Sequence, residues 1–150
     1  MRLQYGRYQG RTAEALLLRA PDYALWVLRH QPDGRLAQHF RSLIAAFDAR
    51  PLQRPCQACG VAATRAAGLP ERVELYFFCD ACALYPDAAP LAAAQDLRTF
   101  ADLAAHVERT ARRRAAARLR GLVRRMAQAK GLPGRITGRA AEAFLAGEVV

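Results

Sequence analysis

Two pairs of cysteines are the residues of this chain whose types and spacing point most directly to chemistry. Cys56 and Cys59 form one C-x-x-C pair, Cys79 and Cys82 form the other, and nineteen residues separate the pairs. Two residues between the thiols let both sulfurs face one point, and four thiolates are a ligand set of tetrahedral structural Zn²⁺. The spacing between the pairs is typical of a four-cysteine zinc site. The sequence therefore predicts a structural zinc ion held by these four residues.

Other uses of the cysteines agree less well with the rest of the sequence. Two disulfides require an oxidising compartment, whereas the first residues lack the apolar core of a secretion signal, so we expect a cytoplasmic protein. A thioredoxin-like redox centre would use one pair inside a βαβ pattern, which the sequence does not show. A rubredoxin-type iron site uses the same four ligands, and zinc and iron stay open on sequence grounds.

The positive charge of the chain is concentrated near its C-terminal end. The formal net charge is +10, and the segment from Arg109 to Arg139 holds eleven cations and no acid. The other residues carry 23 − 11 = 12 cations against 13 acids, which leaves them at −1. A basic segment of this kind is typical of proteins that bind polyanions, above all nucleic acid.

The helical pattern of this segment arranges the cations on one side. We expect one long helix from Phe100 to about Lys130, with a capping box formed by Thr99 and Asp102 at its start and Gly131 after its end. The pairs Arg109/Arg113 and Arg120/Arg124 would then be like-charged neighbours that repel, unless an anion binds. The predicted phosphate contacts of this segment are Arg109, Arg112, Arg113, Arg120, Arg124, Arg125, Lys130 and Arg135.

A protein–protein adaptor is the alternative function. In that case the apolar stripe of the long helix, from Val107 to Met126, would be the surface for a partner or for a second copy of the chain. No nucleotide-binding loop, nucleophile elbow or zinc-protease motif occurs in the sequence, so we expect no catalytic activity. His30, His39 and His106 lack metal-binding partners at helical spacing and are expected to be ordinary surface or helix-end residues.

The N-terminal third combines a turn-rich stretch with short helices. Residues 3–12 alternate tyrosines with polar residues around two glycines and predict a short hairpin or an extended pair. Helices are expected over Ala13–Arg19, from Pro21 or Asp22 onwards, and over residues 36–47.

Two motifs in this third resemble a known family. Residues 5–12 read YGRYQGRT and residues 21–28 read PDYALWVL, which is similar to the small C-terminal module of exodeoxyribonuclease X and related bacterial proteins. The resemblance implies an accessory module of proteins that act on nucleic acid, without catalysis of its own. It also implies that Arg7 and Arg11 contact phosphate. Tyr5, Tyr23 and Trp26 are expected in the core, because a small domain needs its aromatic residues inside.

Together these features predict a mainly helical α+β protein with a small hairpin at the zinc site. The expected segments are residues 1–50, the N-terminal module; residues 51–90, the zinc-binding module; and residues 91–150, the basic helical arm. A strand is expected over residues 72–78, and a short helix or turn after Cys82. Whether that segment is helical separates a treble clef from a zinc ribbon, and both stay open.

Overall fold

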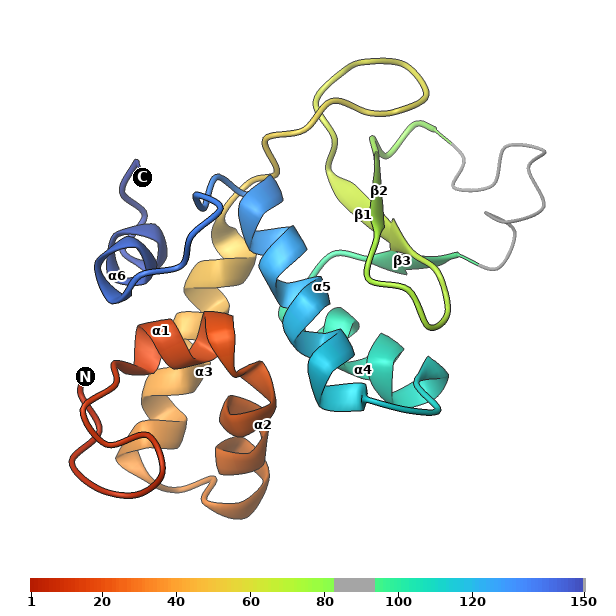
Figure 1. The fold of residues 1–150 in the computed structure, drawn as a ribbon. Coiled ribbons are helices and arrows are strands. Elements are labelled where there is room, and N and C mark those ends of the chain that lie inside the picture. The colour runs from red at the N-terminus through yellow and green to blue at the C-terminus, as the bar shows by residue number, and fades with distance from the viewer. Residues whose placement is uncertain (83–93, 150) are drawn as a thin grey trace.

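The computed structural model describes residues 1–82 and 94–149. In these residues six helices accompany an antiparallel sheet of three strands, which confirms the α+β class expected from the sequence. The elements are α1 (Ala13–Arg19), α2 (Pro21–His30), α3 (Arg35–Ala49), β1 (Arg65–Gly68), β2 (Leu75–Phe78), β3 (Gln95–Leu97), α4 (Phe100–Thr110), α5 (Ala115–Ala129) and α6 (Gly138–Leu145). Figure 1 shows α5 crossing the middle of the molecule, between the N-terminal helices on one side and the sheet with α4 on the other. No helix of the described residues is both long and apolar enough to cross a lipid bilayer.

The N-terminal helices begin where the sequence predicts. The Thr12 hydroxyl accepts a hydrogen bond from the Ala15 N–H at 3.2 Å and caps α1. Pro21 occupies the first turn of α2, where a missing N–H breaks no helical bond. The segment before α1 is an extended pair closed by a loop: the Leu3 N–H donates to the Arg11 carbonyl at 3.0 Å, and the Gly10 N–H donates to the Leu3 carbonyl at 2.9 Å. An isolated antiparallel β-bridge joins Arg2 to Thr12 at the base of this loop.

The expected long helix is wrong: the chain forms two helices that turn between Thr110 and Ala115. The capping box of Thr99 and Asp102 starts α4 as predicted, but α5 begins only after Arg114, whose φ of 52° lies in the left-handed region. A straight helix of 31 residues would be about 46 Å long and would carry much of its apolar stripe away from the other helices. The turn instead lets α4 and α5 pack on the same core.

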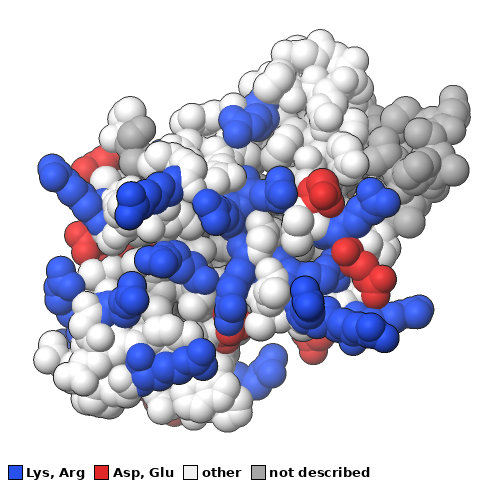
Figure 2. Space-filling view, viewed as in Figure 1, with Lys and Arg blue, Asp and Glu red and all other residues white. Residues whose placement is uncertain are grey.

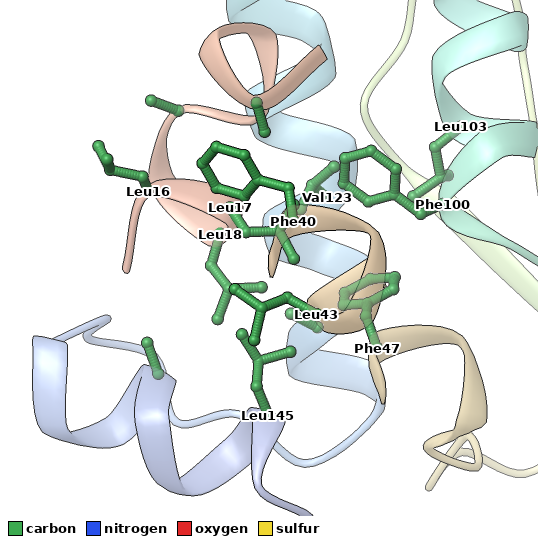
Figure 3. Close-up of a cluster of buried hydrophobic side chains, with 14 of the residues drawn as sticks. Leu16, Leu17, Leu18, Phe40, Leu43, Phe47, Phe100, Leu103, Val123 and Leu145 are labelled. Carbon is green, nitrogen blue, oxygen red and sulfur yellow. The ribbon is translucent and has the colours of Figure 1, made fainter. Parts of the chain in front are cut away.

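That core takes up the apolar stripe that the adaptor hypothesis assigned to a partner. Val107, Leu119, Leu122, Val123 and Met126 are buried, and all belong to one cluster with the N-terminal helices and α6. Figure 3 shows side chains of α1, α3, α4, α5 and α6 meeting in this cluster. The stripe is thus satisfied within the chain, which leaves no face from Val107 to Met126 for an apolar partner.

Aromatic rings join three helices in the centre of the core. The Phe47 ring of α3 packs edge-on against Phe100 of α4 at 5.9 Å and against Phe144 of α6 at 6.3 Å. These helices come from the first and last thirds of the chain. The N-terminal module and the basic arm therefore share one hydrophobic cluster.

The sheet has the strand order β2-β1-β3, with both pairs antiparallel. The strand predicted over residues 72–78 is present as β2, whereas β1 lies in a stretch with no strand signal of its own. Its sequence, RAAG, has low β propensity, so pairing on both sides makes it a strand. Gly68 is required here, because a Cβ at this position would lie 2.6 Å from Cδ1 of Leu97 on β3.

Candidate metal centre and basic surface

The β1–β2 hairpin brings the two cysteine pairs together. Cys56 and Cys59 lie in a tight turn before β1, in which the Gly60 N–H donates to the Cys56 carbonyl at 2.8 Å. Gly60 has a φ of +80°, a conformation that glycine adopts at little cost. Cys79 directly follows β2, and the pairing of Arg65 with Phe78 places the end of β2 beside the start of β1. The second pair therefore faces the first.

The four sulfur atoms form a site that could hold a metal ion. All four Sγ atoms lie within 4.8 Å of one another, and Cys59 Sγ is 3.7 Å from Cys79 Sγ. A tetrahedral ion with metal–sulfur bonds of about 2.3 Å holds its ligands about 3.8 Å apart. The donor set and its spacing therefore fit one four-coordinate ion.

The electrostatics of the site also suit a cation. Burial raises the pKa of the Cys56 thiol, but the backbone N–H groups of Cys79, Cys59 and Ala58 oppose it and lower that pKa to about 6. The neighbouring side chains of Cys79, Cys59 and Cys56 raise the pKa of Cys82 to about 12. Cys56 thus ionises readily while Cys82 resists ionisation, and a bound cation would stabilise all four thiolates together.

Side chains from the sheet hold the second cysteine pair in place. Arg65 of β1 donates from Nε to the Cys79 carbonyl at 3.2 Å and from Nη2 to the Cys82 carbonyl. Asp80, between these cysteines, accepts from Thr64 at 2.9 Å and from Arg98 at 2.8 Å. Sequence reasoning missed Arg65 and Arg98, because it is the pairing of β1 with β2 and with β3 that brings them to the cysteines. The residues after Cys82, including the expected helix or turn and the linker at residues 86–90, lie outside the described residues.

Six arginines from distant parts of the chain line a second feature, which we call the arginine groove. It consists of two adjoining hollows of about 650 and 330 Å³, and Arg19 and Arg120 line both of them. The groove lies between the N-terminal loop with α1 on one side and α5 with the α5–α6 loop on the other. Its arginines are Arg7, Arg11, Arg19, Arg120, Arg124 and Arg135. Figure 2 shows basic side chains spread over the face on which α1 and α5 lie, with few acidic ones among them.

The groove has little internal compensation of its charge. Arg120 forms a two-pronged ion pair with Asp22 of α2, with both N···O distances at 3.0 Å. Arg124 donates to the Gly134 carbonyl at 2.7 Å, which fixes the side chain but neutralises nothing. Sequence reasoning missed Arg19, because α1 reads as an ordinary amphipathic helix.

The other predicted phosphate contacts lie elsewhere. Arg109 donates to Gln95 beside the sheet, and Arg112 and Arg113 line a separate hollow at the α4–α5 turn. Arg125 is exposed on α5 but does not line the groove. The face expected to carry Arg109, Arg113, Arg120 and Arg124 together therefore does not form, because the turn between the helices divides it.

Lys130 is not available to a ligand, which corrects its prediction as a phosphate contact. The residue is 3% exposed. Its ammonium donates to the carbonyls of Phe47, Asp48 and Arg50 at 2.8, 3.3 and 2.9 Å. The cation thus caps the C-terminal end of α3, where a positive charge opposes the partial negative charge of the helix end.

His106 and Arg118 are also buried polar residues. His106 is fully buried, with Nε2 donating to the Leu69 carbonyl at 3.2 Å, although it was expected to be an ordinary surface or helix-end residue. Arg118 of α5 is buried as well and donates to the Arg72 carbonyl at 3.2 Å. Both tie helices α4 and α5 to the loop between β1 and β2.

The aromatic residues of the N-terminal motifs depart from expectation in the opposite direction. Trp26 is 47% exposed and Tyr5 is 84% exposed, although both were expected in the core. Tyr23 is half-buried and packs edge-on against the buried Phe40 at 6.4 Å. Of these three aromatic residues, Tyr23 is the one that packs against the core.

Comparison with protein-family models, curated proteins and solved structures found no match for this chain. The resemblance of residues 1–47 to the exodeoxyribonuclease X module therefore stays a prediction.

Proposed function

We propose that this protein binds nucleic acid through the arginine groove, without catalysis. We also propose that a structural zinc ion, bound by the four cysteines, stabilises the three-stranded sheet. One observation carries the proposal: six arginines from the N-terminal loop, α1, α5 and the α5–α6 loop converge on one concave surface. Gathering like charges costs free energy unless an anion offsets it. Guanidinium groups form forked hydrogen bonds with phosphate oxygens, and a groove lined by several of them suits a phosphate backbone.

The chemistry of the groove favours backbone contact over sequence recognition. Its lining consists of arginines with small and apolar residues such as Gly121 and Ile136, and of Thr137. We therefore propose binding led by charge and shape, with low sequence preference.

Zinc is the metal that we propose for the four-cysteine site. Four thiolates in tetrahedral geometry form a closed coordination shell, which is the arrangement of structural zinc sites. The three short strands bury little apolar surface, and the cluster beside the cysteines consists mainly of Ala67, Leu69, Phe78 and Ala94. A metal bond contributes folding free energy where so small a core cannot.

The experiment compares two triple variants with the same loss of charge. Arg11, Arg19 and Arg135 line the groove and have no side-chain hydrogen bond or ion pair to any described residue, so Gln at all three should leave the fold intact. Arg112, Arg113 and Arg125 lie outside the groove and serve as the matched control. Binding to fluorescent single-stranded and duplex oligonucleotides is measured by anisotropy at low salt.

We expect the groove variant to bind about 10- to 150-fold more weakly than the parent, from three contacts of about 0.5–1 kcal/mol each. The control variant should lose much less, because it changes only the long-range field. Equal losses in the two variants would show that net charge, and not the groove, attracts the ligand. Absence of binding by the parent would refute the proposal.

A further inference from the structure

Four rings of the N-terminal segment form an aromatic column at one end of the arginine groove. Tyr8 packs against Tyr23 at 4.7 Å, and Tyr23 lies nearly parallel to Trp26, with 6.2 Å between centroids and 12° between planes. Trp26 stacks in turn on His30 at 4.8 Å and 22°. His30 is fixed because its Nδ1 donates to the Trp26 carbonyl at 3.0 Å.

Tyr23 anchors the column to the core, whereas Trp26 and His30, towards its other end, are exposed. Tyr23 joins the core through Phe40, whereas the indole, at 47% exposed, keeps about half of its surface in solvent. Tyr5, at 84% exposed, stands close enough to Tyr23 to contribute to the raised pKa of that phenol, which burial raises first and Tyr8 next. Exposed large aromatic side chains gain free energy when a ligand buries them. These exposed rings are therefore suited to bind a ligand.

The column continues the arginine groove without a break. A third hollow of about 330 Å³ is lined by Arg7, Tyr8, Asp22, Tyr23 and Trp26. Arg7 and Tyr8 also line the groove, and the Arg7 guanidinium lies 5.3 Å from the centre of the Tyr8 ring. A chain that follows the groove would therefore reach the rings next.

We infer that the natural ligand is single-stranded nucleic acid, whose phosphates occupy the arginine groove while an unpaired base stacks in the hollow at Trp26. This inference rests on the proposed function and names its substrate class. Bases stack on exposed aromatic side chains beside cationic grooves, with little regard to sequence. A duplex keeps the faces of its bases covered, so it would use the groove but not the rings.

The charges around the hollow favour a base over a cationic ligand. Aromatic rings also bind quaternary ammonium groups, but Arg7 lines this hollow and Arg120 lies beside Asp22 at its edge. Both would repel a cation, and Asp22, the acid that lines the hollow, is already paired with Arg120.

Trp26 is the single tryptophan of the chain, so its fluorescence reports on this hollow directly. The parent protein is titrated with single-stranded DNA, with single-stranded RNA of the same sequence, with the corresponding duplex, and with an abasic oligonucleotide that has phosphates but no bases. We expect both single strands to quench Trp26, and the duplex and the abasic strand to bind without quenching it. The relative affinities for the DNA strand and the RNA strand show which of the two nucleic acids the protein prefers.

Substitution gives a second, independent measurement. Trp26→Ala should weaken binding to the single strand by about 5- to 150-fold, the range for loss of one stacked base, and should leave the abasic strand unaffected. Trp26→Phe, which keeps a ring, should restore most of the affinity. Circular dichroism tests whether both variants are folded. If a variant does not fold, the quenching of Trp26 in the parent protein still tests the inference.

The outcomes separate this inference from the proposed function. No binding of any oligonucleotide refutes both. Binding of single strand, duplex and abasic strand with equal affinity and no quenching overturns the stacking inference and leaves the groove in place. Quenching by tetramethylammonium chloride and not by single strands would assign the rings to a cationic ligand and also overturn it.

Discussion

Replacing Lys130 by Met tests whether this cation holds helices together or contacts a ligand. In the native protein its ammonium donates to three carbonyls at and beyond the end of α3, two of them at 2.8 and 2.9 Å. Burial lowers the pKa of Lys130, and the carboxylate of Asp48 opposes this shift. Methionine keeps most of the length and the apolar stem but removes the donor.

The expected cost follows from the carbonyls that lose their partner. A buried polar group left without a hydrogen bond costs about 1–3 kcal/mol, and the helix end also loses a compensating charge of about 0.3–1 kcal/mol. The Phe47 carbonyl keeps a second donor, the Arg50 N–H at 3.3 Å. Solvent can also reach the edge of the site, since Asp48 and Arg50 are only half-buried. We therefore take the lower part of the range for the two short contacts and expect a loss of about 3 kcal/mol. For a chain of this size the melting temperature would fall by about 6–12 °C.

Thermal unfolding followed by circular dichroism measures the effect, with zinc at a fixed concentration. Arg125→Met is the control, because it removes an exposed cation from the same helix and should change stability by less than about 0.5 kcal/mol. Lys130→Met should bind oligonucleotides like the parent at temperatures where it is folded. The reasoning is refuted if Lys130→Met is as stable as Arg125→Met, or if the folded variant loses binding.

Three further predictions concern the metal, a glycine and pH. Native protein should contain one zinc per chain by elemental analysis, and Cys59→Ser or a chelator should release it and unfold the sheet; one iron per chain, or less than about half an equivalent of any metal, would contradict the assignment. Gly121→Ala should destabilise by about 1 kcal/mol in chemical denaturation despite the better helix propensity of alanine, because its Cβ would lie 2.8 Å from Cγ1 of Val73; a more stable variant would show that this contact relaxes freely. Burial raises the pKa of Glu14, but hydrogen bonds from its own backbone N–H and from His39, at 3.0 Å, together lower this pKa below the usual 4.5. The Glu14 carboxylate therefore stabilises the fold above pH 4.5, and this stabilisation is lost as the pH falls through the lowered pKa. Glu14→Gln should flatten the decline in stability below pH 4.5, and an unchanged decline would count against this assignment.

The parts of the structure that local patterns determine could be predicted from the sequence. The spacing of the four cysteines predicted one cluster, and the hairpin that joins them brings their sulfurs within reach of a single ion. Helix starts with a chemical signal, such as Thr12, Pro21 and the capping box at Thr99, were also predicted correctly.

The turn between α4 and α5 could not be predicted in the same way, because the apolar period and the alanines continue through it. Arg114 adopts a positive φ that nothing in the neighbouring sequence requires. The position of the turn is instead determined by the packing of both helices on a common core. Lys130 likewise looks like an exposed residue at a helix end. Its burial depends on the end of α3, eighty residues earlier, lying beside it.

The arginine groove depends on tertiary structure for the same reason. Sequence reasoning found Arg7 and Arg11 through a family resemblance, and Arg120, Arg124 and Arg135 through the cluster of cations. It could not show that these two groups face each other, nor that Arg19 joins them and Arg109 does not. The exposure of Trp26 was missed because a small domain is expected to bury its tryptophan.

The salt dependence of binding tests the central claim most directly. Six arginines line the groove and one of them is paired with Asp22, so 6 − 1 = 5 are free to neutralise phosphates. On a single-stranded oligonucleotide the logarithm of the binding constant should fall against the logarithm of salt concentration with a slope of about −0.7 × 5, or −3.5. The variant with Gln at Arg11, Arg19 and Arg135 should show a slope of about −0.7 × 2, or −1.4, while the variant with Gln at Arg112, Arg113 and Arg125 should keep the parent slope. A parent slope near zero, or a slope that falls in the control variant and not in the groove variant, would contradict the account.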